Sequence, residues 1–237
     1  MVFQGLLNKE DLYVENGTKV PFSLSKGEKK MKVLLINGSP HGHGCTYTAL
    51  KEIEKTLRLE GIETEMFYLG NKPIGGCLGC GACKKTGKCV QDDVVNKILP
   101  KALAAGGIIL GAPVHYASAA GQASAAFDRL FVMSNGGFAN KLGAAVVSCR
   151  RGGASATFDQ LNKYFTISNM PVVSGTYWNQ VHGNTPEEVQ RDLEGMQNMR
   201  AIGRNMAWLL KCIEAGQQAG VALPEREEKI KTNFMQG

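Results

Sequence analysis

Four cysteines crowd into a short stretch of the chain, and their spacing is the clearest chemical signal in the sequence. They are Cys77, Cys80, Cys83 and Cys89, arranged as C-x2-C-x2-C-x5-C. Structural zinc usually uses two cysteine pairs set apart by a longer loop, whereas three cysteines at x2 intervals are typical of loops that wrap thiolates around an iron–sulfur cluster. The spacing favours one 4Fe–4S cluster, with metal-free thiols and a zinc site as the alternatives.

The residues between these cysteines suit such a cluster. Three glycines give the backbone the conformational freedom that wrapping needs. Three lysines, Lys84, Lys85 and Lys88, would offset the negative charge of thiolate ligands. The loop follows an expected strand whose carboxyl end should reach the edge of the sheet where the next segment also lies.

A glycine- and hydroxyl-rich segment, NGSPHGHGCTYT at residues 37–48, is the second chemical signal. It joins a continuous apolar run to an amphipathic one, so it should open a helix after a buried strand. Backbone N–H groups and the helix dipole make such a start an anion site. The loop lacks the lysine of a nucleotide-triphosphate loop and the G-x-G-x-x-G spacing. We expect the phosphate of a mononucleotide here; an ordinary strand–helix turn is the alternative.

Two further segments should lie at the same sheet edge. In GAPVHYASAAGQ, residues 111–122, a turn containing Pro113 can present backbone groups to a flat heterocycle, and Tyr116 offers an aromatic face. In SCRRGG, residues 148–153, two arginines and two glycines would complete the rim of a cofactor site. Each segment taken alone also fits a simple turn at a strand end.

Alternating strands and helices should position these loops. Apolar runs predict strands at 32–37, 63–69, 107–110, 142–148 and 171–177. Helical spacing predicts helices at 46–59, from Asp92 or Asp93 to 104 with a kink or end at Pro100, at 119–133, around 158–165, and in one long pattern from Thr185 to Ile213. The order indicates an α/β fold: a doubly wound, five-stranded parallel sheet in three αβα layers, with ligands at the switch point.

Composition excludes several classes of protein. The 237 residues are 43% hydrophobic and 20% charged, which is ordinary for a globular chain and excludes bulk disorder. No apolar run is long enough for a membrane helix, and no secretory signal opens the chain, so we expect a cytoplasmic protein. The net charge of +6 is dispersed, which argues against nucleic acid; it forms a solvated surface or attracts phosphorylated cofactors. We expect an extension at 1–30, a domain at 31–215 with a cysteine loop at 75–92, and a tail at 216–237.

Three stretches together resemble a known family. They are GSPHGHGCTYTAL, CLGCGACKKTGKCVQDD and GAPVHYASAAGQASAAFDR. They look like the NAD(P)H-dependent FMN reductase family, which has a flavodoxin-like fold, and the cysteine loop is similar to the iron–sulfur flavoproteins within it. The resemblance covers roughly residues 31–215.

The resemblance implies a set of FMN contacts and an assembly. Phosphate contacts would be Ser39, His41, Cys45 and Thr46, where His41 replaces the family's usual Arg or Lys and Cys45 its usual Asn. The isoalloxazine contacts would be Pro113, Val114, His115, Tyr116 and Ala117, with Gly152 and Gly153 close by. Family members bind FMN at the edge between subunits, as dimers or dimers of dimers.

The function that follows is an FMN-dependent oxidoreductase. It would take hydride from NAD(P)H and pass electrons to a quinone, a flavin, a nitroaromatic or its own cluster. Because the flavin supplies the chemistry, we name no acid–base catalyst. One alternative is a non-enzymatic FMN/iron–sulfur carrier that accepts electrons from ferredoxin. Another is a metal-dependent sensor built on the cysteine loop.

Overall fold

A two-stranded ribbon and a larger α/β unit make up the part of the chain that the computed structural model describes, residues 12–15, 18–21, 31–228, 230 and 232. In the ribbon, β1 (Leu12–Glu15) pairs antiparallel with β2 (Thr18–Pro21) as a separate sheet. The rest of the expected extension at 1–30 lies outside the described residues, so its role as an arm stays a prediction.

The main sheet has five parallel strands in the order β4-β3-β5-β7-β8. The strands are β3 (Lys32–Asn37), β4 (Glu63–Tyr68), β5 (Gly107–His115), β7 (Leu142–Cys149) and β8 (Gln180–His182). After β4 the chain crosses back over β3 to form β5, so the switch point lies between the carboxyl ends of β3 and β5. This is the flavodoxin-like, doubly wound arrangement predicted from the sequence.

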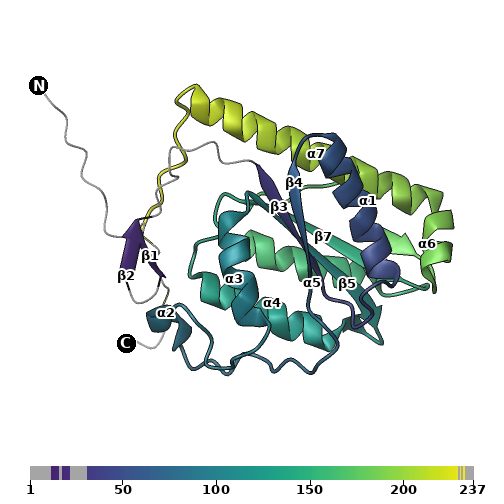
Figure 1. Cartoon of the computed structure of the whole chain (residues 1–237), viewed down its shortest axis with the longest axis horizontal. Helices are drawn as coiled ribbons and strands as arrows, with labels where there is room; N and C mark the ends of the chain where they lie inside the picture. The colour runs from purple at the N-terminus through teal and green to yellow at the C-terminus, as the bar shows by residue number, and fades with distance from the viewer. Residues whose placement is uncertain (1–11, 16–17, 22–30, 229, 231, 233–237) are drawn as a thin grey trace, which may run out of the picture.

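Helices cover both faces of this sheet (Figure 1). One face carries α1 (Cys45–Leu59), α6 (Pro186–Arg191) and α7 (Leu193–Gln218). The other carries α3 (Val95–Ala104), α4 (Gly121–Ser134) and α5 (Ala154–Ile167). The short helix α2 (Cys83–Thr86) lies within the cysteine loop. None of the described helices is both long and apolar enough to cross a membrane.

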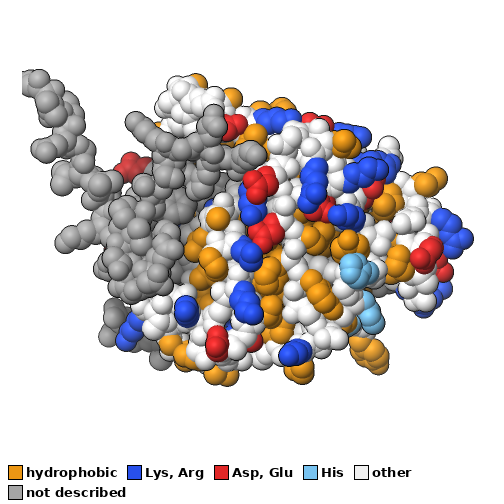
Figure 2. Space-filling view, viewed as in Figure 1, with side chains coloured by type: hydrophobic (Ala, Val, Ile, Leu, Met, Phe, Trp, Pro, Cys, Tyr) orange, Lys and Arg blue, Asp and Glu red, His pale blue; other side chains and the backbone are white. Residues whose placement is uncertain are grey.

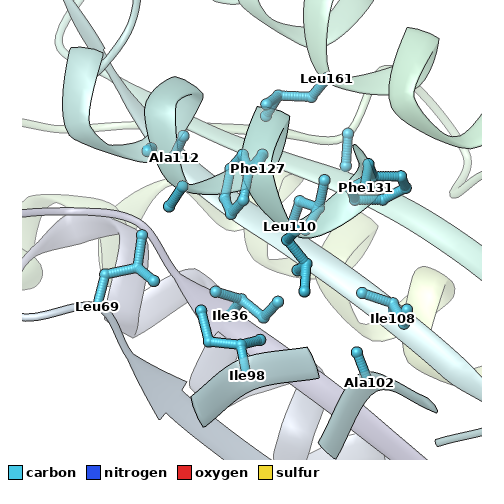
Figure 3. Close-up of a cluster of buried hydrophobic side chains, with 14 of the residues drawn as sticks. Ile36, Leu69, Ile98, Ala102, Ile108, Leu110, Ala112, Phe127, Phe131 and Leu161 are labelled. Carbon is cyan, nitrogen blue, oxygen red and sulfur yellow. The ribbon is translucent and has the colours of Figure 1, made fainter. Parts of the chain in front are cut away.

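Strand alternation divides the core into two clusters. Along β3, Val33 and Leu35 face the layer of α1 and α7, while Leu34 and Ile36 face the layer of α3, α4 and α5. All four are completely buried, which explains why this strand reads as an unbroken apolar run. Figure 3 shows the second cluster, where Ile36 lies with side chains from β5, α3 and α4.

The fifth strand is not where the sequence pattern predicts it. Within residues 171–177, Val172 forms only an isolated bridge with Gly143, and the fifth strand is β8, further along the chain. The cause is Asn198 of α7, whose Oδ1 accepts hydrogen bonds from the backbone N–H of Thr176 and Tyr177. Its Nδ2 donates to the carbonyls of Tyr177 and Trp178. These bonds take backbone groups that a strand would use in its ladder.

The long helical pattern at 185–213 is two helices rather than one. As predicted, Thr185 caps the first by accepting a hydrogen bond from Glu188 N. The chain then breaks at Asp192, whose carboxylate accepts from Gly195 N at 2.9 Å and from His182 N of β8 at 2.7 Å. A carboxylate that ties two elements to the first turn of α7 makes this break a structural junction.

Smaller differences concern element ends. The expected strand 107–110 continues as β5 to His115, and the expected helix 119–133 begins at Gly121, because Ser118–Ala119 pairs with β5 as the short antiparallel strand β6. Pro100 does not end α3, which continues to Ala104 with Leu99 and Ala102 buried on either side of it.

Charge is dispersed over the surface. On the face shown in Figure 2, Lys and Arg side chains are interspersed with Asp and Glu rather than gathered in a stripe of one sign. Several of the charges are paired, as Arg200 is with Glu52 and Lys211 with Glu60. This agrees with the reading of the +6 net charge as a mixed, solvated surface.

Candidate functional site

The loop after β3 packs against β5 at the switch point. Gly38 N donates to the carbonyl of Gly111 at 2.8 Å. A Cβ at Gly38 would lie 2.7 Å from Ala123 Cβ and 2.8 Å from that same carbonyl oxygen. Only glycine fits where two chain segments approach this closely. The first candidate segment therefore packs directly against the second.

The loop after β7 joins them through two contacts. The hydroxyls of Thr46, at the start of α1, and Ser148, near the end of β7, lie 2.8 Å apart and are both buried. Gly153 has φ of +87°, and a Cβ there would lie 2.8 Å from Val114 Cγ1. The three segments that the sequence singled out thus meet at one edge of the sheet.

Side-chain hydrogen bonds shape the loop between β3 and α1. Ser39 N donates to Asn37 Oδ1, and His41 N donates to Ser39 Oγ, both at 3.1 Å. Asn37 Nδ2 donates to Gly42 O at 3.1 Å. The buried Ser39 hydroxyl therefore holds the loop's conformation, while His41 and His43 are exposed on its outer side.

A cleft of about 640 Å³ lies beside this loop. Its lining comprises residues 40–45, Tyr68, Asn71 and residues 184–186. Helix α1 starts here at Cys45, with no side-chain cap and no acidic residue in its first turn. The first N–H groups of a helix lack intrahelical partners. Together with the positive end of the helix dipole they fit a phosphate group.

Tyr68 is a wall of this cleft that the sequence reasoning missed. Its hydroxyl donates to Pro40 O at 2.6 Å, and its ring packs so close to Gly42 that a Cβ there would lie 3.2 Å from it. The available signal was its position: it ends the second strand, whose carboxyl end must reach the same edge as the loop.

Cys45 makes a backbone contact rather than serving as an acidified thiol. Its Sγ lies 3.6 Å from the carbonyl of Gly183 and donates to it. Burial raises the pKa of the thiol, and the charges of Glu188 and Glu187 raise it further. Near neutral pH, Cys45 is therefore protonated and can join the loop to the residues after β8.

The tip of the β5–β6 hairpin carries residues that the family resemblance assigns to the isoalloxazine ring. Val114 pairs with Ala119 and His115 with Ser118, so the turn consists of Tyr116 and Ala117. Pro113 lies in β5 and not in the turn, contrary to expectation. Tyr116 has φ of +56° and a fully exposed side chain. A non-glycine residue in this region is strained, and such strain gathers at functional sites.

The four loop cysteines line a second, separate pocket of about 240 Å³. All four are free thiols; Cys77 and Cys80 are exposed, and Cys83 and Cys89 are partly buried. Four thiols on one pocket are the donor set that an iron–sulfur cluster uses. As they are placed, however, no three His, Cys, Asp or Glu side chains among the described residues are grouped closely enough to hold an ion.

Arg129 of α4 organises this pocket, and the sequence reasoning did not single it out. Its side chain is 1% exposed. It binds both carboxylate oxygens of Asp93, at 2.6 and 2.8 Å, and donates to Cys89 Sγ at 3.3 Å. Burial raises the pKa of Asp93, but hydrogen bonds from Arg129 and from Val95 N, together with the charge of Arg129, outweigh it, so that the net pKa is lowered. Asp93 therefore stays ionised beside the cysteine loop.

The cysteine pocket does not lie at the sheet edge where the other loops meet, but further along α4. It contacts Arg129, Val132 and Met133 in the second half of α4, while Gly121 begins that helix beside β6. Eight residues of helix separate Gly121 from Arg129, about 12 Å at ~1.5 Å per residue. Figure 1 shows the chain running from the end of β4 back to α2. The end of β4 reaches that edge, as expected, with Tyr68 beside residues 40–45, and the cysteine loop then extends from it to the second half of α4.

The fold and these loops define a flavodoxin-like α/β protein with a cleft at the start of α1, beside the loop that follows β3. Residues 31–185 match the family model described as NADPH-dependent FMN reductase. The chain belongs to this family of flavin-dependent oxidoreductases.

Its relatives narrow the group. An iron–sulfur flavoprotein of Methanocaldococcus jannaschii is 35% identical over 192 residues, 78% of this chain and all of that protein. An iron–sulfur flavoprotein of Methanosarcina thermophila is 33% identical, over 78% of this chain and 97% of that one. These relatives place the chain in the iron–sulfur flavoprotein subgroup.

Solved structures agree on the fold. RosB with a bound 8-demethyl-8-formylriboflavin-5′-phosphate superposes with a TM-score of 0.61 at 16% identity, covering 86% of this chain and 92% of that one. A flavone reductase superposes with a TM-score of 0.57 at 19% identity, covering 78% and 64%.

Proposed function

We propose that this protein binds FMN at the switch-point edge and passes electrons from NAD(P)H to a small acceptor, such as a quinone, a flavin or a nitroaromatic, or to an iron–sulfur cluster held by its own cysteine loop. Bound FMN supplies hydride and single-electron chemistry through its ring system. The protein's part is to bind, orient and shield it.

The observation that carries this proposal is the meeting of three strand-end loops beside an uncapped helix start. The backbone N–H groups at the start of α1 hold the phosphate, with the Ser39 and Thr46 hydroxyls keeping the loop in shape and His41 and Cys45 at its rim. The hairpin residues Pro113, Val114, His115, Tyr116 and Ala117, with Gly152 and Gly153, receive the isoalloxazine ring. RosB, which shares the fold, holds a flavin phosphate.

The deciding experiment is an anaerobic purification followed by visible spectroscopy and steady-state assays. We expect resolved flavin bands and rapid NADPH oxidation with a quinone as acceptor. A colourless protein, or one that binds flavin but is not reduced by NADPH or NADH, would contradict the reductase.

The cysteine pocket carries the second part of the proposal: Cys77, Cys80, Cys83 and Cys89 ligate one 4Fe–4S cluster. Support comes from the shared pocket, the four free thiols and the names of the relatives. Iron and acid-labile sulfide should each approach about four per subunit after anaerobic reconstitution. A Cys89→Ala variant should lose iron and keep FMN, because the flavin loops are separate. Values near zero in the wild type would leave a plain FMN reductase.

A carrier that accepts electrons from ferredoxin is the alternative that one observation favours. Lys84, Lys85 and Lys88 are all exposed beside the cysteine pocket, and a basic patch of this kind steers an acidic protein toward the site. Fast reduction by ferredoxin that slows with added salt, together with slow NADPH turnover, would favour the carrier over the reductase.

A further inference from the structure

All five N–H donors of Arg129 form hydrogen bonds to the cysteine loop and the residues that flank it. Its Nε donates to Cys89 Sγ, one terminal nitrogen donates to Gly75 O and Asp93, and the other donates to Gln91 O and Asp93. A guanidinium has five N–H donors in a rigid fork, so every one is used. These partners lie at the two ends of the loop, so one side chain on α4 closes it.

The closure fixes one cysteine much more firmly than the other three. The backbone of Cys89 is also clamped by Asn96 of α3, which accepts from Cys89 N at 2.9 Å and donates to Cys89 O at 3.1 Å. Of the four loop thiols, all of them within the described chain, Cys89 is the one whose sulfur accepts a hydrogen bond. Cys77 and Cys80 are exposed, and Cys80 lies between Gly79 and Gly81, which are both in left-handed conformations.

We propose that Arg129 is the positioning residue of Cys89: it holds this sulfur as the fixed ligand around which the other three cysteines close, and its N–H···S bond sets the reduction potential of the cluster. The inference rests on the proposed cluster. A hydrogen bond to a ligand sulfur stabilises the extra negative charge that one-electron reduction adds, which raises the potential.

The first test needs no cluster. In the reduced, metal-free protein, hydrogen–deuterium exchange of peptides covering 75–93 should be about tenfold or more faster in Arg129→Gln than in the wild type. Asp93→Asn keeps the Arg129 bond to Cys89 and should fall between them. Circular dichroism and FMN content should be unchanged, because the fold of α4 and the proposed FMN loops do not depend on the bonds between Arg129 and the cysteine loop. Equal exchange in the wild type and Arg129→Gln would overturn the proposal.

The second test measures the potential of the reconstituted cluster by EPR-monitored titration. Arg129→Lys keeps a positive charge but lacks the planar, five-donor guanidinium group and the N–H···S bond to Cys89. We expect its cluster to be harder to reduce, by about tenfold in the reduced-to-oxidised ratio, or ~59 mV for one electron. Lys84→Gln, which removes a charge from the same pocket, is the matched control and should shift far less. Equal shifts in both variants would overturn the role of the hydrogen bond.

The outcomes distinguish a failure of this inference from a failure of the proposed iron–sulfur cluster on which it rests. If the wild type takes up no iron or sulfide, the proposed cluster is wrong and the inference about its potential falls with it. If iron binds normally and the Arg129 variants match the wild type in exchange and potential, the function stands and the inference is wrong.

Discussion

At the scale of residues, the proposed FMN site is built from side chains that hold its loops in shape. The Thr46 hydroxyl is paired with Ser148, and the Ser39 hydroxyl holds His41 N. In the proposed site the backbone N–H groups at the start of α1 would be the phosphate donors, so binding would not require a cation at position 41. This gives a physical reason why His41 and Cys45 can stand where the family usually has Arg or Lys and Asn.

Replacing Ser39 and Thr46 together with Ala should therefore weaken FMN binding. We expect a loss of about tenfold in affinity, roughly 1.4 kcal/mol, because the loop loses its internal bond from His41 N to Ser39 and its bond from Thr46 to Ser148 of β7. Fluorescence titration of the apoprotein with FMN measures it. Thr56→Ala is the matched control, since that hydroxyl bonds Glu52 O within the same helix and far from the cleft. Unchanged affinity in the double variant would mean that the phosphate site lies elsewhere.

At the scale of elements, close helix contacts hold the scaffold. A Cβ at Gly203 of α7 would lie 2.8 Å from Thr56 Cβ of α1, so glycine lets these two helices approach. Beneath them, the carboxylate of Glu54 on α1 is 4% exposed and bonds Lys51 and Arg58, each at 2.6 Å. Burial raises the pKa of Glu54, but these partners outweigh it, and the net pKa is lowered from its usual value of about 4.5.

A Glu54→Gln variant should lose stability in a pH-dependent way. A lowered pKa in the folded state means that the charged form stabilises the protein above about pH 4.5, and that this is lost as pH falls through the folded-state pKa. Because Lys51 and Arg58 are more than half exposed, we expect a loss of only about 1 kcal/mol at pH 7. Urea unfolding at pH 7 and pH 3.5 should show the difference shrinking. Glu60→Gln, in an exposed pair with Lys211, should cost less at both.

The hydrogen bonds of Asn198 to residues 176–178, called the Asn198 clamp below, give a second prediction at the scale of elements. Asn198 is buried, and Asn198→Ala would remove its four hydrogen bonds to the backbone of residues 176–178, so we expect a loss of about 2 kcal/mol in unfolding free energy. Hydrogen exchange at 174–179 should also quicken. Asn205 donates to Ser174 O in the same loop but from an exposed position, so Asn205→Ala should cost less than half as much. Similar losses in both variants would contradict the clamp.

At the scale of the whole molecule, the proposed FMN site and the cysteine pocket lie at opposite ends of α4. Tyr177, Trp178, Leu193 and Trp208 are at least half exposed. Aromatic side chains, three of these four, are enriched in the surfaces through which proteins associate. They support, without testing, the dimer or dimer of dimers that the family resemblance implies.

The assembly is tested by sedimentation at micromolar concentration. We expect a homo-oligomer, because the family binds FMN between subunits, and we expect deletion of residues 1–30 to lower its stability if that segment is an arm on a neighbouring subunit. Dilution series of both proteins provide the measurement. A monomeric full-length chain contradicts the oligomer, and an equally stable oligomer after deletion contradicts the arm.

The sequence by itself determined the alternation of strands and helices, four of the five strands of the parallel sheet, and the three loops at its carboxyl edge. These depend on local patterns: unbroken apolar runs such as 32–37, and glycines and hydroxyls placed just after them. The four cysteines of the loop are equally local, because their spacing is read within thirteen residues.

Only the tertiary structure decided how distant residues complete these sites. Asn198 redirects a segment some twenty residues earlier and moves the fifth strand from 171–177 to β8. Thr46 finds Ser148 a hundred residues along the chain, and Arg129 reaches back to Cys89 and Asp93. Such bonds leave no periodic trace in the sequence, because their partners are brought together by the packing of the sheet and helices and not by their spacing.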